Sequence, residues 1–241
     1  MSPEPTPTPT SPADTALRPS EVNSIAWGDL VAELDGCRAD ENGPAISGIT
    51  LDSRQVRHGD LYVGLHGLHA HGARFAGSAA QSGAVAVLTD DEGATLAADA
   101  GVPIIVVPDA RAAMAVAAAK IFGHPADAMT MFGVTGTNGK TTTAFLVEAG
   151  LRAAGRHVGT IGTIGFQLDG VELPSARTTV TTPEAPDLQG LFGAMAERGA
   201  TDVVMEVSSH ALALQRVDGT RFDVAAFTNL GRDHLDFHKT L

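Results

Sequence analysis

Two hydrophobic patterns alternate along the first half of the chain: short runs of β-branched residues, and longer stretches rich in alanine. The short runs predict strands over residues 45–51, 60–65, 85–89 and 103–107. The longer stretches predict helices over residues 72–83 and 110–122, the second with Asp109 as its N-cap and Gly123 after its end. Strands that alternate with helices are typical of an α/β fold with a parallel sheet.

The second half opens with a nearly all-apolar run at residues 129–135, typical of a strand buried on both faces of a parallel sheet. The pattern after it predicts further elements in alternation: a helix over 140–154, a strand over 157–161, a helix over 183–198, and strands over 202–207 and 223–227. The glycine-rich stretch 159–165 is interpreted as a strand and a turn.

Breaks in this pattern divide the chain into a tail and two domains. Residues 1–20 are rich in proline and threonine, lack the basic and apolar regions of a secretory signal, and predict a disordered tail. Gly123, His124 and Pro125 end the last helix of the first half, and we place the domain boundary there. The predicted domains are residues 21–125 and 126–241.

Composition narrows the possible partners. The 241 residues include 16 basic and 28 acidic side chains, and the formal net charge of −12 argues against nucleic acid as a partner because its phosphates would be repelled. The longest apolar stretches are shorter than the roughly 20 residues that span a bilayer, so no membrane insertion is expected. Cys37 is the single cysteine, which excludes an internal disulfide and fits a reducing cytosol.

Residues 133–143, GVTGTNGKTTT, have the features of a phosphate-binding loop, because they combine glycines, a lysine and a hydroxyl between a buried strand and a helix. Lys140 can reach the β- and γ-phosphates of a nucleotide, and Thr141 can place its hydroxyl on Mg²⁺. Val134 departs from the P-loop spacing G-x-x-x-x-G-K-[ST], which has glycine there. The alternatives are a glycine-rich turn that binds nothing, and a dinucleotide site, for which the glycines of 159–165 have the wrong spacing.

Residues 133–142 resemble the ATP loop of the Mur ligases and their relatives, folylpolyglutamate synthetase and cyanophycin synthetase, in which valine at the position of Val134 is the rule. Three further stretches resemble the E-type members of the Mur ligase family: ITLDSRQVRHGDLYVGLHG (49–67), EVSSHAL (206–212) with Arg216, and FTNLGRDHLDFH (227–238). The resemblance implies an α/β nucleotide-sugar domain followed by part of a P-loop central domain. It also implies an unfinished central sheet, so we expect exposed apolar surface around the last strands and a tendency to aggregate.

This resemblance implies an ATP-dependent ligase of peptidoglycan synthesis. A carboxylate of UDP-MurNAc-L-Ala-D-Glu attacks ATP to form an acyl phosphate, and the amine of a diamino acid, diaminopimelate or lysine, then displaces phosphate. The E-type members are three-domain cytoplasmic enzymes, expected to be monomeric at full length, and residues 1–241 alone are expected to be inactive. The alternatives are another Mur-type ligase, such as the F type, which consumes the UDP-MurNAc-tripeptide, and a non-catalytic nucleotide-binding module.

The resemblance also implies roles for individual residues. ATP contacts fall on the phosphate loop, at Gly136, Thr137, Asn138, Gly139, Lys140, Thr141 and Thr142. Catalytic roles fall on Lys140, Glu206 and His234, and magnesium ligands on Thr141, Glu206 and His234. Independently of the resemblance, Glu206 ends an apolar strand, where an unpaired carboxylate is costly, so the sequence favours a metal partner over a salt bridge.

Substrate contacts implied by the resemblance fall on Ser53, Thr181, Thr182, Ser208 and Arg216. Other interpretations stay open for several polar residues. Thr182 before Pro183 also fits a helix N-cap, and His69 and His71 fit surface histidines better than ligands. His234 and His238, four apart, would suit zinc on a helix, and the run 208–210 would suit a hydrolase, but neither has its usual surrounding motif.

Overall fold

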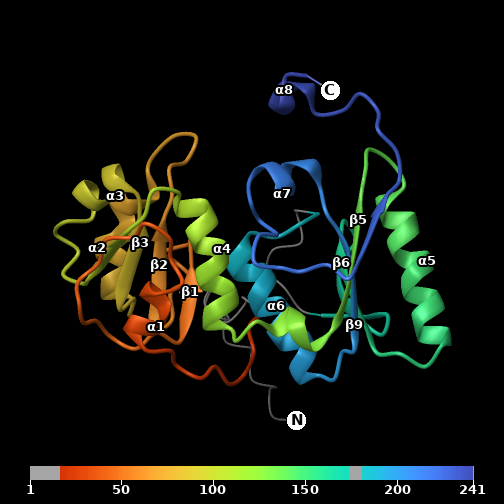
Figure 1. The fold of residues 1–241 in the computed structure, drawn as a ribbon, viewed down its shortest axis with the longest axis horizontal. Helices are drawn as coiled ribbons and strands as arrows, with labels where there is room; N and C mark the ends of the chain where they lie inside the picture. The colour runs from red at the N-terminus through yellow and green to blue at the C-terminus, as the bar shows by residue number, and fades with distance from the viewer. Residues whose placement is uncertain (1–16, 174–180, 241) are drawn as a thin grey trace, which may run out of the picture.

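The computed structural model describes residues 17–173 and 181–240, and its strands form two separate sheets (Figure 1). The first sheet is parallel throughout, in the order β1-β2-β3-β4. Its strands are β1 (Gly48–Thr50), β2 (Asp60–Gly64), β3 (Ala86–Thr89) and β4 (Ile104–Val106). All four were predicted from the hydrophobic pattern, and the α/β fold class with parallel strands is confirmed.

Helices cover both faces of this first sheet (Figure 1). One core contains Leu30, Ile49, Leu88 and Met114 and joins the sheet to α1 (Trp27–Val31) and α4 (Ala110–Ile121). A second core contains Tyr62 and joins the sheet to α2 (Ala76–Gln81), which a 3-10 turn precedes (Gly72–Phe75). The predicted N-cap of α4 is confirmed, because the Asp109 carboxylate accepts hydrogen bonds from the N–H groups of Arg111 and Ala112.

The second sheet has the order β10-β5-β9-β6-β7-β8. Its strands are β5 (Thr130–Thr135), β6 (Val158–Gly162), β7 (Gly165–Leu168), β8 (Val171–Glu172), β9 (Asp202–Glu206) and β10 (Val224–Phe227). The four strands β10, β5, β9 and β6 run parallel, and β7 and β8 extend the sheet antiparallel. The strand and turn predicted for residues 159–165 are confirmed as β6 and its connection to β7.

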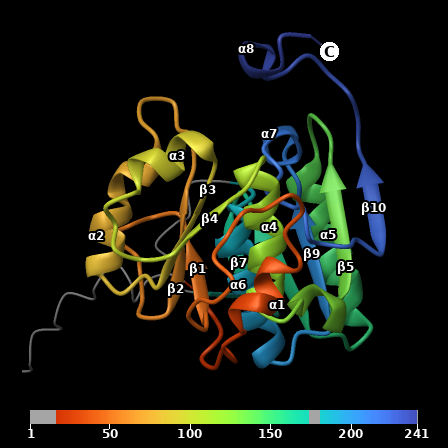
Figure 2. The ribbon, with the colours of Figure 1, turned by 60° about the vertical axis from the view of Figure 1, so that its left-hand side comes forward.

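Two long helices cover the second sheet, α5 (Lys140–Ala153) on one face and α6 (Ala185–Glu197) on the other. Successive residues of β9 alternate between them: Val203 and Met205 lie in the core with Phe192 of α6, and Val204 lies in the core with Ala144 of α5. α6 also faces the first sheet beside α4, so these two helices form the layer between the sheets (Figures 1 and 2).

The hydrophobic pattern did not predict several short elements, because pieces of two to six residues are decided by packing more than by periodicity. They are α1, α3 (Asp91–Leu96), the 3-10 turn Pro125–Ala128, β7, β8, α7 (Ser209–Ala213) and α8 (Leu235–His238). The helix predicted to start at residue 183 starts at Ala185 instead, with Glu184 before it and proline at the first helical positions. Thr182 is therefore not the N-cap of this helix.

Residues 17–20 make specific contacts, although the sequence placed them in a disordered tail; residues 1–16 lie outside the described residues. Arg18 forms an ion pair of 2.7 Å with Asp60 at the start of β2 and donates to the carbonyl of Ile49. The N–H groups of Ser20 and Glu21 donate to the Glu197 carboxylate at the end of α6. This segment therefore connects the first sheet to a helix of the second.

Apolar side chains are exposed along and after the edge strand β10, as the sequence led us to expect. Val224 and Phe227 on the strand are 47% and 63% exposed, and Leu230 after it is 70% exposed. Aggregation through this edge stays a prediction. In the part of the chain that the structure describes, no helix is long and apolar enough to cross a membrane.

Candidate active site

The loop between β5 and α5 has the backbone shape of an anion site. Gly136 and Gly139 have positive φ angles of 130° and 84°, which favour glycine. A Cβ on Gly136 would lie 2.2 Å from the Thr228 hydroxyl, so no other residue fits there without a shift. Gly139 precedes α5 without a side-chain cap, so the first-turn N–H groups of this 14-residue helix point outward without a capping acceptor.

Lys140 begins α5 and folds back over the loop. Its Nζ donates to the carbonyl oxygens of Gly136 (2.7 Å) and Thr137 (3.0 Å). Within residues 17–173 and 181–240 no carboxylate pairs with it, so backbone dipoles alone hold this cation beside the open N–H groups. A lysine held in this way can exchange the carbonyls for the oxygens of a phosphate.

Glu206 ends β9 and is 2% exposed. Its Oε2 accepts from the hydroxyl of Thr141 (2.9 Å), and its Oε1 accepts from the N–H of Thr163 (2.9 Å). A Cβ on Gly162 would lie 2.2 Å from Oε1, so glycine makes room for the carboxylate. Among the described residues Glu206 has no cationic partner, and the salt bridge weighed from the sequence stays untested because Arg177 lies outside these residues.

The donor set fits a magnesium ion. Thr141 and Glu206 present adjacent hard oxygens beside the phosphate loop, and Mg²⁺ is usually held by one or two carboxylates together with waters and substrate phosphates. The described residues contain no group of three or more His, Cys, Asp or Glu side chains placed to hold a metal, so a closed protein cage is absent from them. The loop and its neighbours fit a nucleotide phosphate with a partly hydrated Mg²⁺.

Sheet topology explains why these groups meet. β5 pairs with β9 so that Val134 lies opposite Glu206, which places the end of β9 directly beside the start of the loop. β6 lies on the other side of β9 and ends at the Thr163 turn. Carboxyl ends of parallel strands share one edge of a sheet, and this edge is where ligands bind in open α/β folds. The sequence could not show that β9 lies between β5 and β6.

The predicted substrate residues of the second half cluster beside Glu206. The Thr182 hydroxyl donates to the Glu206 carbonyl (2.9 Å) and accepts from the N–H of Ser208 (3.0 Å). Thr181 lies 3.2 Å, oxygen to oxygen, from the Thr163 hydroxyl. Arg216 donates to the Thr182 carbonyl (3.2 Å). The structure therefore brings together four residues that the sequence spreads over 36 positions, 181 to 216.

Glu184 joins this cluster and was missed from the sequence. Its carboxylate accepts from Arg216 (2.8 Å) and from Arg111 of α4 (3.2 Å), and all three side chains are mostly buried. Arg216 is therefore neutralised in this structure by a carboxylate that a second arginine also holds. No sequence signal identifies this three-membered group, because its members come from three distant segments.

His234 lies across the loop, in a cleft of about 560 Å³ whose lining also includes Lys140 and Ser208. Its ring packs edge-on against His210, with centroids 4.5 Å apart. Burial, and then the nearby charges of His234 and His238, lower the pKa of His210.

The zinc alternative gains no support, since the described residues hold no metal-binding group of three. The Ser208 hydroxyl accepts the Ala211 N–H as the N-cap of α7, which gives this serine a structural role, whereas Ser209 Oγ lies 2.9 Å from His238 Nε2; the hydrolase alternative stays untested.

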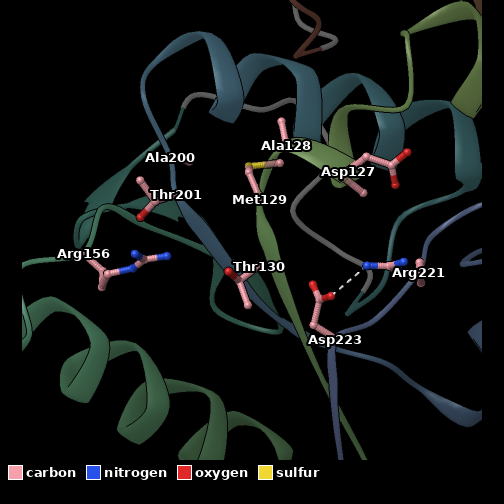
Figure 3. Close-up of a pocket in the computed structure, with 10 residues that line it drawn as sticks. Asp127, Ala128, Met129, Thr130, Arg156, Ala200, Thr201, Arg221 and Asp223 are labelled. Atoms are coloured by element: carbon pink, nitrogen blue, oxygen red, sulfur yellow. Dashed lines mark hydrogen bonds and ion pairs between the residues drawn. The ribbon is translucent and has the colours of Figure 1, made fainter.

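The amino-terminal edge of the same sheet holds a second cavity, of about 550 Å³ (Figure 3). Two arginines line it, and each is paired with an aspartate: Arg156 with Asp202 at 2.7 Å, and Arg221 with Asp223 at 3.2 Å. Both cations of this cavity therefore already have a carboxylate partner, unlike Lys140 at the phosphate loop.

The first sheet carries the remaining predicted contact. Ser53 lies half-buried in the turn after β1, at the carboxyl-terminal edge. His69 is exposed, but His71 is buried, contradicting the surface interpretation: its Nδ1 accepts from the N–H of Ala73, and its Nε2 lies 3.0 Å from Asp90. His71 therefore shapes the loop after β2. Burial raises the pKa of neighbouring Tyr62 to about 12.

Comparison with known proteins gives matches over both halves. The model described as "Mur ligase family, catalytic domain" matches residues 45–121, and that of the Mur ligase middle domain matches residues 134–241. The UDP-N-acetylmuramoyl-L-alanyl-D-glutamate–2,6-diaminopimelate ligases of Streptomyces coelicolor and Corynebacterium glutamicum are 51% and 52% identical to the chain. Each alignment covers 92% of this chain and 43% of the relative, so the chain spans less than half the length of these relatives.

Solved structures agree. A structure of a diaminopimelate ligase with the same name superimposes with a TM-score of 0.71 at 28% identity, over 90% of this chain and 42% of the other. MurF ligase from Thermotoga maritima, solved in complex with ADP, superimposes with a TM-score of 0.52 at 25% identity, over 80% of this chain and 40% of the other. Family matches in order along the sequence, high identity to curated relatives and the shared fold agree: the chain belongs to the Mur ligase family.

Proposed function

We propose that this chain forms the nucleotide-sugar-binding and ATP-binding parts of a ligase that adds a diamino acid to UDP-MurNAc-L-Ala-D-Glu in peptidoglycan synthesis. The observation that carries the proposal is the open phosphate loop beside Glu206, a buried carboxylate with no cationic partner in the described chain. The names of the relatives support UDP-MurNAc-L-Ala-D-Glu as the acceptor and diaminopimelate as the added amino acid.

When bound, ATP would supply the γ-phosphoryl group that activates the acceptor carboxylate as an acyl phosphate, with ADP as the leaving group, and Mg²⁺ would neutralise charge on the phosphates. The first-turn N–H groups of α5 and the Lys140 ammonium bind the phosphates, and Lys140 gives up its two carbonyl partners to do so. Thr141 and Glu206 would hold the Mg²⁺ through their oxygen atoms. These groups would stabilise the negative charge that develops on the transferring phosphoryl group. The nucleophile is the acceptor carboxylate rather than a side chain of the protein.

The acceptor binds on the side of the loop where Thr181, Thr182, Ser208 and Arg216 meet. The guanidinium of Arg216 suits a carboxylate, and Glu184 can release it because Arg111 still neutralises Glu184. Ser53, in the first sheet, contacts the uridine nucleotide. His234 faces the loop across the cleft, and the family resemblance gives it a role as a magnesium ligand.

The proposal extends to the organisation and setting of the protein. Residues 21–125 form the nucleotide-sugar domain and residues 126–241 belong to the ATP-binding domain. The single cysteine fits the reducing cytosol, where we place the reaction. We expect a monomer without a nucleic-acid partner, consistent with the net charge of −12.

Turnover tests this proposal against its two alternatives. A full-length chain should release phosphate only when ATP, UDP-MurNAc-L-Ala-D-Glu and diaminopimelate are present together. Phosphate release that ignores the UDP-linked substrate would contradict the ligase assignment, and ATP binding without any phosphate release would favour the non-catalytic nucleotide-binding module. Consumption of the UDP-MurNAc-tripeptide instead would identify an F-type ligase. Residues 1–241 alone should bind nucleotide but not turn over.

A further inference from the structure

The segment after β10 runs along the phosphate loop and holds it through several hydrogen bonds. The Asn229 carbonyl accepts from the N–H of Thr137 (2.9 Å). The Asn229 carboxamide pairs twice with the backbone of Asn138: its Oδ1 accepts from the N–H (3.0 Å), and its Nδ2 donates to the carbonyl (2.8 Å). The Thr228 hydroxyl donates to the same carbonyl at 2.7 Å.

These bonds divide the loop into two halves. The N–H groups of Thr137 and Asn138 are used by residue 229, whereas the N–H groups at the start of α5 stay open. A Cβ on Gly136 would collide with Thr228 and approach the Asn229 backbone to 3.0 Å, so the two segments are in close contact. One half of the loop is therefore fixed by protein, and the other half faces the ligand.

We propose that Asn229 is a positioning residue that holds the phosphate loop in its anion-binding shape before the nucleotide arrives. The inference rests on the proposed function, because it assumes that this loop binds ATP. Asn229 touches the loop backbone rather than Lys140, Thr141 or Glu206, so it acts through the loop. The segment that contains Asn229 continues to His234, and both this segment and the phosphate loop line the cleft. The hydrogen bonds of Asn229 therefore connect these two sides of the cleft. A loop already in its bound shape loses less freedom on binding, which raises affinity.

Asparagine suits this position for a chemical reason. A peptide group offers one donor and one acceptor. A carboxamide can bond to both at once, because its oxygen accepts and its nitrogen donates. Aspartate would keep the bond to the Asn138 N–H but would turn a second carboxylate oxygen toward the Asn138 carbonyl, where the present distance is 2.8 Å. Alanine would remove both bonds.

The test compares Asn229→Ala, Asn229→Asp and a control, Asn42→Ala, which changes an exposed asparagine far from the loop in sequence. Hydrogen exchange on the nucleotide-free chain should show the Asn138 amide exchanging about tenfold faster in Asn229→Ala, which loses the bond to this N–H, and by a smaller factor in Asn229→Asp, which keeps it. The Kd for ATP with Mg²⁺, measured by calorimetry, should rise about tenfold in both. In a full-length chain, the KM for ATP should rise while the KM for the UDP-linked substrate stays unchanged.

Unchanged exchange at Asn138 together with an unchanged Kd would overturn the proposal. If the Asn229 variants do not fold, exchange in the nucleotide-free wild-type chain decides instead, because the bond from the Asn138 N–H to the Asn229 Oδ1 should protect this amide. An Asn138 amide that exchanges as fast as an unbonded amide would overturn the proposal. A wild-type chain that does not bind ATP would defeat the proposed function, while the exchange measurement would still decide whether Asn229 holds the loop.

Discussion

Strand β9 begins and ends with a carboxylate, and the two carboxylates have different kinds of partner. Asp202 and Glu206 are each 2% exposed. Asp202 accepts two hydrogen bonds from the Arg156 guanidinium (2.7 and 3.1 Å) and one from the Thr201 hydroxyl. Within the described residues, Glu206 accepts only from neutral donors of Thr141 and Thr163. The carboxylate at the amino-terminal edge of the sheet is neutralised by an arginine of the protein. The carboxylate at the carboxyl-terminal edge has no such partner among the described residues and is free to bind a metal ion.

Under the proposed function, this difference separates a structural edge from a functional one. Burial alone would raise the pKa of Asp202. The hydrogen bonds from Arg156 and Thr201, together with the arginine charge, lower this pKa by more than burial raises it, so the net shift is downward. At the other edge, a buried carboxylate without a cation is costly, and a metal ion beside a phosphate loop removes that cost. Cavity volume does not distinguish the edges, since both hold about 550 Å³.

The largest expected effect is on turnover, from Glu206→Gln. Glutamine can keep the hydrogen bonds to Thr141 and Thr163, but it is a poor magnesium ligand, so kcat in a full-length chain should fall at least about 100-fold. Thermal unfolding without Mg²⁺ should be unchanged or occur at higher temperature, because an uncompensated buried charge is removed. Strong destabilisation by this substitution would show that Glu206 is structural.

The matched substitution at the other end of β9, Asp202→Asn, should have the reverse profile. It removes the charge that Arg156 faces, and the free energy of unfolding should fall by about 1–2 kcal/mol, a discounted value because Arg156 is half-exposed. ATP affinity should not change. Urea titration and calorimetry measure the two quantities, and a loss of ATP binding at full stability would contradict the division of roles.

Acid should weaken the amino-terminal edge in a defined pH range. The pKa of Asp202 is lowered in the fold, so its stabilising contribution is complete above the unfolded pKa of about 3.9 and is lost as the pH falls through the lower folded value. Stability should therefore fall as the pH drops below about 4, and less steeply in Asp202→Asn. Parallel curves for the two proteins would show that this pair does not titrate as described.

The smallest effect is expected from Arg221→Ala. Arg221 is 83% exposed, and exposed ion pairs contribute little, so neither stability nor ATP binding should change measurably. A clear loss of ATP binding would mean that the cavity in Figure 3 communicates with the phosphate loop, and would remove the contrast between the two edges.

Periodicity and motif spacing predicted the parallel strands and the phosphate loop, because a buried strand, two glycines, a lysine and a helix start are consecutive in the sequence. They did not predict Thr163, Glu184 or Asn229, which reach the site only because β9 and β10 flank β5 and because α4 lies against α6. Glu206 was identified from its position at a strand end, but its neutral partners required the strand order. The roles assigned to the site residues, Ser53 and His234 among them, remain predictions.

The most direct test measures ATP binding by residues 1–241 with and without Mg²⁺, in the wild-type chain and in Glu206→Gln. If Glu206 and Thr141 hold the metal that ATP brings, Mg²⁺ should lower the Kd for ATP about tenfold or more in the wild type and have little effect in the variant. An equal gain from Mg²⁺ in both proteins would contradict the assignment of the open edge as the metal and nucleotide site.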